Sequence, residues 1–223
     1  MILLSRTPDI FNQDYEAFLF DMDGTLLNSI AIVERVWAGW AERQGIEPHA
    51  FMQTIHGMRA VDVVTREAIP GLDPIQEAAL LLEEEMADVD GILLIPGILN
   101  FLASLPAERW AIVTSAPRAL ALRRMAAVGI PMPKVLICAE DIVNGKPDPS
   151  GYLLGAEKLG FAAGDCVVFE DAPAGILAGE RAGAKVVVIN TTHSHVFDTQ
   201  HPSIASYDEL TAVVTENGRL KLV

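Results

Sequence analysis

The chain has 223 residues, of which 51% are hydrophobic and 21% charged, a balance that suits one or two folded domains and excludes extensive disorder. Its formal net charge of -14 opposes general binding to nucleic acids or anionic membranes, because the summed field repels phosphate groups at long range. No basic segment precedes an apolar start, and no apolar run approaches membrane-spanning length, so we expect a cytoplasmic protein.

The first predicted strand covers Ala17 to Phe20, four apolar residues that are too few for a helix and typical of a strand buried on both faces. Asp21 and Asp23 follow at its carboxyl end, the edge at which open α/β sheets bind ligands. Two aspartates at the end of a buried strand are costly unless they are hydrogen-bonded or bind a cation. The stretch therefore predicts a cation site, and an ordinary turn is the alternative.

The segment from residue 30 to about residue 93 reads as all-helical. Apolar spacing and capping residues predict three helices, over about 32–44, 61–69 and 74–86. Gly45 and Pro48 are expected to end the first of them. Because the insertion is too large for a connecting loop, we expect a small helical domain, 29–94, hinged over a core domain formed by 1–28 and 95–223.

From residue 96 short β-rich runs alternate with predicted helices, which is typical of a parallel sheet covered by helices. The runs rich in Val, Ile and Phe are 109–114, 134–138, 166–170 and 185–189. Helices are predicted between them, over about 117–128, 150–159 and 173–182. Together with the first strand, this pattern predicts a five-stranded α/β core, a Rossmann-like parallel sheet with an inserted all-helical cap, and Asn217 and Gly218 predict a C-terminal hairpin.

Polar residues gather where the predicted strands end. They are Asp21 and Asp23, Thr114 and Ser115, Glu170 and Asp171, with Lys146 in the loop before the helix that leads to strand four. These side chains can converge, because the carboxyl ends of parallel strands share one edge of the sheet. Carboxylates suit Mg²⁺, and hydroxyls with free helix-start amides suit phosphate oxygens. A lysine can neutralise both a phosphate and an attacking carboxylate, so the set predicts phosphoryl transfer.

Four strings carry a family resemblance over essentially the whole chain. DMDGTLLNS, AIVTSAP, NGKPDPSGY and VVFEDAPAG, in this order and with a helical insert after the first, resemble the haloacid dehalogenase superfamily. The resemblance implies that Asp21 forms an aspartyl-phosphate and that Asp23 protonates the leaving oxygen, activates water and binds Mg²⁺ through its backbone carbonyl. It also implies that Thr114, Ser115 and Lys146 hold the phosphoryl group and that Asp171, with Glu170, completes the metal site.

The carboxylate at position 23 favours phosphate esters, because dehalogenases and phosphonate-cleaving members of the superfamily lack it. The loop IHGMRAVD resembles the cap loop of 2-deoxyglucose-6-phosphatase and glycerol-3-phosphatase relatives, which implies that His56 and Arg59 lie over the substrate; a surface turn is the alternative. We therefore expect a Mg²⁺-dependent phosphatase of small sugar or polyol phosphates, as a monomer or homodimer. A phosphosugar mutase and a non-catalytic phosphosugar-binding protein are the alternatives.

Several other features predict no chemistry. His193, His195 and Asp198 fall in a polar loop and are expected at the surface, with a metal site as the minor alternative. The acidic run over 83–85 is expected to be a solvated helix face. The two cysteines, Cys138 and Cys166, lie in apolar runs and are expected to be buried packing residues, and the string GKP at 145–147 lacks the P-loop glycine pattern.

Overall fold

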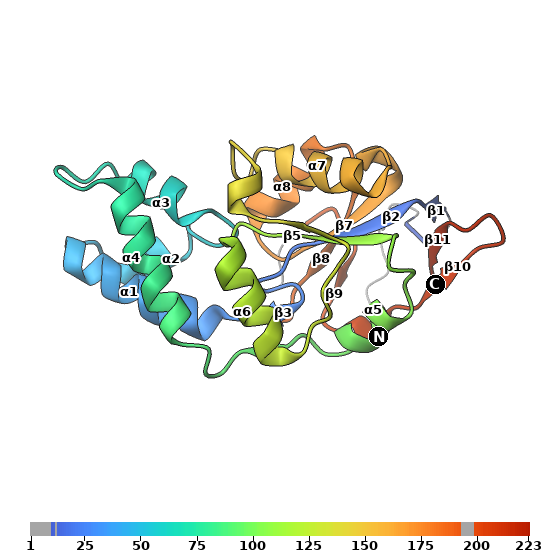
Figure 1. Cartoon of the computed structure of the whole chain (residues 1–223), viewed down its shortest axis with the longest axis horizontal. Helices are drawn as coiled ribbons and strands as arrows, with labels where there is room; N and C mark the ends of the chain where they lie inside the picture. Colours follow the sequence, from blue (N-terminus) through green and yellow to red (C-terminus); the bar gives the residue numbers. More distant parts are fainter. Residues whose placement is uncertain (1–9, 12, 193–198) are drawn as a thin grey trace.

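The core of this computed structural model, which describes residues 10–11, 13–192 and 199–223, is a six-stranded parallel sheet (Figure 1). The strands lie in the order β6 (Val135–Ile137), β5 (Trp110–Val113), β2 (Ala17–Phe20), β7 (Cys166–Glu170), β8 (Lys185–Ile189) and β9 (Ser203–Ile204). Phe20 of β2 is in register with Ile112 on one side and with Phe169 on the other. The predicted α/β fold class is confirmed. His193, His195 and Asp198 lie outside the described residues.

Helices cover both faces of the sheet because alternate side chains of β2 point to opposite sides. Phe18 and Phe20 join the apolar cluster that includes side chains of α5 (Ile98–Ala103) and α6 (Arg118–Val128). Ala17 and Leu19 join a second cluster with α7 (Ser150–Leu159) and α8 (Pro173–Arg181). Burial on both faces explains why the β2 sequence is continuously apolar. The bounds of α6, α7 and α8 agree with the predicted helices to within one residue.

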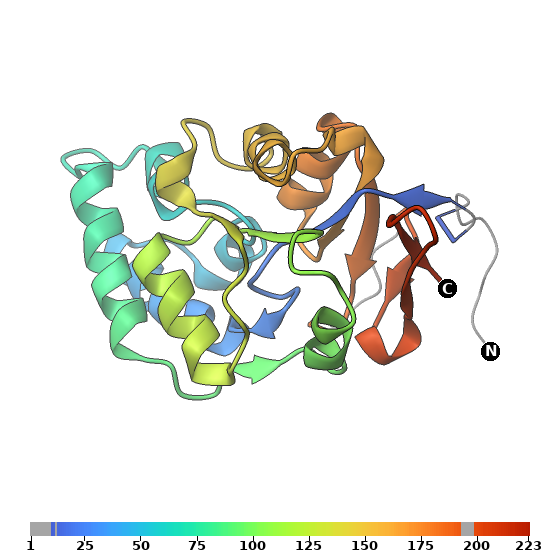
Figure 2. The ribbon, with the colours of Figure 1, turned by 45° about the vertical axis from the view of Figure 1, so that its right-hand side comes forward.

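The insertion after β2 is helical, as predicted, and forms one end of the molecule in Figure 2. Its helices are α1 (Ile30–Gln44), α2 (Pro48–Met52), α3 (Ala60–Glu67) and α4 (Pro74–Ala87). The chain enters through β3 (Leu27–Asn28) and leaves through β4 (Leu93–Leu94), which pair antiparallel with Leu27 opposite Leu94. These two short strands join the helices to the sheet.

Short elements account for the differences from the predicted fold. Pro48 was expected to lie beyond a helix end, but it begins α2, where the Glu47 side chain caps the backbone amides of His49 and Ala50. The sheet gains β9 as a sixth strand. The predicted C-terminal hairpin is present as β10 (Ala212–Val214) and β11 (Leu220–Leu222), and β1 (Asp14–Tyr15) pairs with β11.

The two cysteines are buried, as expected. Cys138 and Cys166 are buried free thiols, and burial raises their pKa values to about 11 and about 12, so both stay uncharged. None of the helices in the described part of the chain combines the length and apolarity needed to cross a lipid bilayer.

Candidate active site

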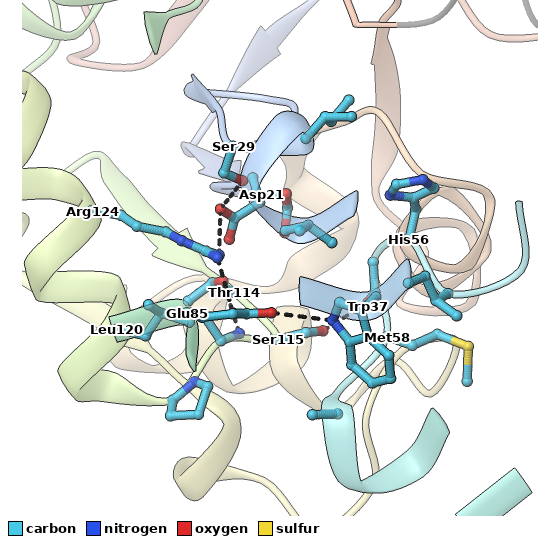
Figure 3. A pocket seen from close by; sticks show the side chains of 18 of the residues that line it. Asp21, Ser29, Trp37, His56, Met58, Glu85, Thr114, Ser115, Leu120 and Arg124 are labelled. Atoms are coloured by element: carbon cyan, nitrogen blue, oxygen red, sulfur yellow. Dashed lines mark hydrogen bonds and ion pairs between the residues drawn. The ribbon is translucent and has the colours of Figure 1, made fainter. Parts of the chain in front are cut away.

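A cavity of about 100 Å³ opens at the carboxyl ends of the central strands, between the sheet and the helical insertion (Figure 3). Asp21 follows β2 directly, Thr114 follows β5 and Asp171 follows β7, and all three side chains belong to its lining. The parallel register of β2 with both neighbours places these strand ends side by side. His56 and other residues of the insertion close the opposite side.

Lys146 lies buried beside the carboxylates of Asp21 and Glu170. It is 5% exposed, and its Nζ donates hydrogen bonds to Asp21 Oδ1 and to Glu170 Oε1, the second at 2.5 Å. Burial by itself would lower the pKa of Lys146, but the adjacent Asp21 and Glu170 carboxylates outweigh it and raise that pKa. The lysine therefore stays protonated at neutral pH.

The acidic side chains outnumber this cation. Asp21, Glu170 and Asp171 each offer a carboxylate oxygen within 4.8 Å of the others, against the single charge of Lys146. Burial raises the pKa of Asp21 to about 8, with Lys146 opposing and Glu170 adding to the shift. Burial, followed by Glu170 and Asp21, also raises the pKa of Asp171. A divalent cation would relieve this repulsion, and an all-oxygen donor set fits a hard ion.

Glu170 organises the cluster through hydrogen bonds. It is fully buried, and its Oε1 accepts from Lys146 and from the Tyr152 hydroxyl at 2.9 Å. Its Oε2 accepts from the backbone amides of Asp171 and Ala172, both at 2.9 Å. Four bonds thus fix the lysine and the turn after β7 in one arrangement.

The turn after β2 comes very close to Asp171. Thr25 Oγ1 donates to Asp171 Oδ1 at 3.2 Å. Gly24 has φ +90°, and a Cβ at this position would lie 2.0 Å from Asp171 Oδ2. The glycine of the DMDGT string therefore serves both a left-handed backbone and a contact that a side chain would prevent.

Thr114 and Ser115 connect the strand end of β5 to its surroundings. The backbone amide of Ala116 donates to Thr114 Oγ1 at 3.1 Å, just before α6 begins. Ser115 Oγ donates to the carbonyl of Gly57 in the insertion at 2.7 Å. One predicted site residue thus also joins the core to the insertion.

Asp23 lines the same cavity and is held by two donors. Its Oδ1 accepts from Ser29 Oγ at 2.6 Å and from Arg124 Nη1 at 2.8 Å. Arg124 also donates to Glu85 of α4 at 2.9 Å (Figure 3). Glu85 is buried, so the expectation of a solvated face over 83–85 is wrong at this position, because α4 packs Glu85 against Arg124 and Trp37.

The two predicted residues of the insertion lie differently. His56 is part of the cavity lining. Arg59 pairs with Asp62, with Nε 2.6 Å from Oδ2, and its Nη1 donates to the Ile142 carbonyl of the core at 3.2 Å. The structure therefore brings the strand-end residues and His56 together around one cavity, whereas the Arg59 guanidinium contacts the loop that precedes Lys146.

Sequence reasoning did not assign Arg124, Glu85 or Ser29 to the candidate site. Arg124 lies in a helix with other arginines, and Glu85 follows two further glutamates, so neither shows a local pattern of burial. Ser29 was noted only as the end of the DMDGTLLNS string and as the first residue of the helical insertion. Contacts between α4 and α6 create this part of the site, and those contacts join segments far apart in the chain.

Fold and site together define an α/β enzyme whose acidic site lies between a Rossmann-like core and a helical insertion. The family model described as haloacid dehalogenase-like hydrolase matches residues 15–183 of this chain. Hexitol phosphatase A of Escherichia coli is 42% identical over 180 residues, which cover 78% of this chain and 83% of the relative. The chain belongs to the haloacid dehalogenase-like hydrolase family, and the resemblance seen in its four strings is confirmed.

One further relative and one solved structure are also similar to this chain. 2-Deoxyglucose-6-phosphate phosphatase 2 of Saccharomyces cerevisiae is 35% identical over 209 residues, which cover 81% of this chain and 82% of the relative. A solved structure of β-phosphoglucomutase from Clostridium difficile superposes with a TM-score of 0.76, covering 88% of this chain and 93% of that one. At 20% sequence identity, the second similarity shows a shared fold alone.

Proposed function

We propose that the protein is a Mg²⁺-dependent phosphatase of small sugar or polyol phosphates that acts through an aspartyl-phosphate on Asp21. The observation that carries the proposal is the arrangement at the end of β2, where Asp21 is paired with Lys146 and Asp23 borders the same cavity. Both relatives described above are named as phosphatases. The class of the enzyme is accordingly that of the phosphoric monoester hydrolases.

In this mechanism Asp21 forms a bond to phosphorus while the bond from phosphorus to the ester oxygen breaks. Lys146 offsets the negative charge of nucleophile and phosphate as they approach. Thr114 and Ser115 hold phosphoryl oxygens, together with amides at the start of α6. Asp23 donates a proton to the leaving alcohol oxygen and then accepts a proton from the water that attacks phosphorus and frees Asp21.

Asp21 and Asp171 are the residues that would hold Mg²⁺, with the backbone carbonyl of Asp23, while Glu170 adds negative charge beside them. The bound ion supplies charge neutralisation, so that a carboxylate can approach a phosphate. The pKa values of Asp21 and Asp171 are raised by burial first and then by the neighbouring carboxylates, and a bound cation would favour the ionised form of both groups.

The sugar or polyol part of the substrate would lie toward the insertion. The cavity wall there offers the polar groups of Ser29 and His56 and the indole of Trp37, which suit a small leaving group rich in hydroxyls. We assign 29–94 to a cap that excludes water from the reaction and 1–28 with 95–223 to the core. His56 then lies over the substrate, and Arg59 acts at the edge between cap and core.

A panel of hexitol, hexose, 2-deoxyglucose and glycerol phosphates tests the proposal, with Mg²⁺ or with EDTA. Wild type is expected to release phosphate only with Mg²⁺, and Asp21→Asn should lose at least about 10³-fold of the activity. Asp90→Asn, at an exposed position, is the matched control. No turnover of any ester would contradict the proposal. A sugar bisphosphate product would indicate a mutase, and binding without turnover a binding protein.

A further inference from the structure

Two buried charged side chains beside the cavity have no place in the mechanism above. Arg124 of α6 is 3% exposed, and Glu85 of α4 is 9% exposed. Burying an ion pair removes both partners from water, and such pairs are often no more stabilising than apolar residues of similar size. Fold stability alone is therefore a weak explanation for burying the Arg124 guanidinium and the Glu85 carboxylate beside the candidate active site.

Arg124 bridges Glu85 and the carboxylate of Asp23. Its Nη1 donates to Asp23 Oδ1 at 2.8 Å, and its Nη2 donates to Glu85 Oε2 at 2.9 Å. Glu85 is held in turn by the indole of Trp37, which donates to Oε1 at 3.1 Å. Because a guanidinium is planar and its donors have fixed directions, the position of Glu85 restricts the orientation of Arg124.

The two donors that hold Asp23 meet the same oxygen. Ser29 Oγ and Arg124 Nη1 both donate to Oδ1, at 2.6 Å and 2.8 Å. Because both donors occupy Oδ1, the oxygen of Asp23 that they leave available to a leaving group is Oδ2. The arrangement thus selects which oxygen of Asp23 can donate to a leaving group.

We propose that Arg124 is a positioning residue for Asp23 and that Glu85 fixes Arg124 from the insertion. This proposal rests on the proposed function, since it takes Asp23 as the general acid. Asp23 and Arg124 belong to the core, whereas Glu85 and Trp37 belong to the helices of the insertion. The acid is therefore fully oriented only when α4 lies against α6, as it does in this structure.

The leaving group provides a test, because protonation matters most for a poor one. An alkoxide from a polyol phosphate needs the proton of Asp23 in the transition state, whereas p-nitrophenolate leaves without it. The constant kcat/KM reports the step in which the leaving group departs, and the later hydrolysis of the aspartyl-phosphate does not enter it. A misplaced acid should therefore lower kcat/KM for alkyl phosphates selectively.

The experiment compares Arg124→Met and Arg124→Lys with wild type on p-nitrophenyl phosphate and on the best alkyl phosphate of the panel. Arg124→Met should lower kcat/KM for the alkyl ester about 10- to 100-fold and for the nitrophenyl ester less than about threefold. Arg124→Lys, which keeps a donor, should recover part of the loss. Arg123→Met, at the exposed neighbouring position, should leave both values unchanged. Equal losses on the two esters, or no loss, would overturn the proposal.

A substitution of Glu85 tests the proposal independently. Glu85→Leu should shift the ratio of the two kcat/KM values in the same direction, by about 3- to 10-fold, because Arg124 then lacks its second anchor. The control is Glu83→Leu, at an exposed position of the same helix, which should leave the ratio unchanged. An unchanged ratio in a folded Glu85→Leu protein would overturn the role of Glu85. If Arg124→Met does not fold, the double variant with Glu85→Leu removes both buried charges and is expected to show the same selective loss.

Asp23→Asn separates this proposal from the proposed function. It should show the selective loss on alkyl esters more strongly than any variant of Arg124. If Asp23→Asn loses both esters equally, the acid role that the proposed function gives to Asp23 is wrong, whereas the phosphatase activity itself is tested by the ester panel. If Asp23→Asn is selective and Arg124→Met is not, only the positioning role of Arg124 is wrong.

Discussion

Lys146 and Glu170 form a salt bridge of 2.5 Å inside the protein, and the same ammonium group also bonds Asp21. The side chains of Lys146 and Glu170 are 4% and 0% exposed. Lys146, which pairs with Asp21, is thus also bonded to a carboxylate that accepts a hydrogen bond from the backbone amide of Asp171. Asp21, Lys146, Glu170 and Asp171 therefore form one connected unit.

Replacing Lys146 should therefore affect stability as well as activity. In Lys146→Met, Asp21 and Glu170 lose their shared cation inside the protein, and we expect a loss of about 3 to 5 kcal/mol in the free energy of unfolding in EDTA. Urea unfolding measures this value. Lys158→Met, at an exposed position of α7, should change it by less than about 0.5 kcal/mol. Similar small effects in both variants would show that the buried pair is not energetically coupled to the fold.

The raised pKa of Asp21 predicts a pH dependence of stability in the metal-free protein. Burial raises this pKa from 3.8 to about 8, so between these values the folded state keeps a proton that the unfolded state has lost. The contribution of Asp21 to the free energy of unfolding is therefore largest below the unfolded value and declines as the pH rises toward about 8, by at most about 1.4 kcal/mol per pH unit.

Asp21→Asn isolates this effect because an amide does not titrate. In EDTA, the stability of the variant relative to wild type should increase between about pH 5 and about pH 8, as urea unfolding measures it. Mg²⁺ should reduce the difference, since a bound cation favours the ionised carboxylate. Unfolding free energies that run parallel across this range would contradict the raised pKa.

Local patterns were sufficient to predict which polar residues gather at the carboxyl edge of the sheet, but not the residues of the cavity wall toward the insertion. The apolar run that ends at Asp21 is a local signal, and parallel strand order then brings Thr114 and Asp171 to the same edge. Arg124 and Glu85 give no such signal, because their burial depends on α4 packing against α6, and 39 residues separate the two side chains in sequence. Two-residue strands such as β9 are too short to show alternation.

The motif places Arg59 over the substrate, whereas in the structure its guanidinium contacts the loop that precedes Lys146. Its guanidinium bonds Asp62 and the carbonyl of Ile142, and a Cβ at Gly145 would lie 2.6 Å from Arg59 Nε. If Arg59 acts by holding the loop that carries Lys146, Arg59→Met should lower kcat about 10-fold with little change in KM. Steady-state kinetics on the best substrate measures both constants.

The control for Arg59 lies on α3, the helix that begins directly after Arg59. Arg66 is exposed and bonds Thr54 and Glu67 within the insertion, so Arg66→Met should leave kcat and KM near their wild-type values. A rise in KM for Arg59→Met with unchanged kcat would instead support the motif-based interpretation, in which this arginine binds the substrate directly.

Gly24 provides a test of the proposed Mg²⁺ site in which no carboxylate is substituted. In Gly24→Ala the new Cβ would lie 2.0 Å from Asp171 Oδ2, so Asp171 or the turn after β2 must move. We expect the apparent Kd for Mg²⁺, measured from the shift of Tm with Mg²⁺ concentration, to rise at least about 10-fold.

Gly45→Ala is the matched control, because Gly45 also has a positive φ, +73°, but no atom lies within 4 Å of its added Cβ. That variant should lose about 1 kcal/mol of stability from backbone strain and keep its Mg²⁺ affinity. Equal Mg²⁺ affinities in the two variants would show that Asp171 is not a ligand of the ion.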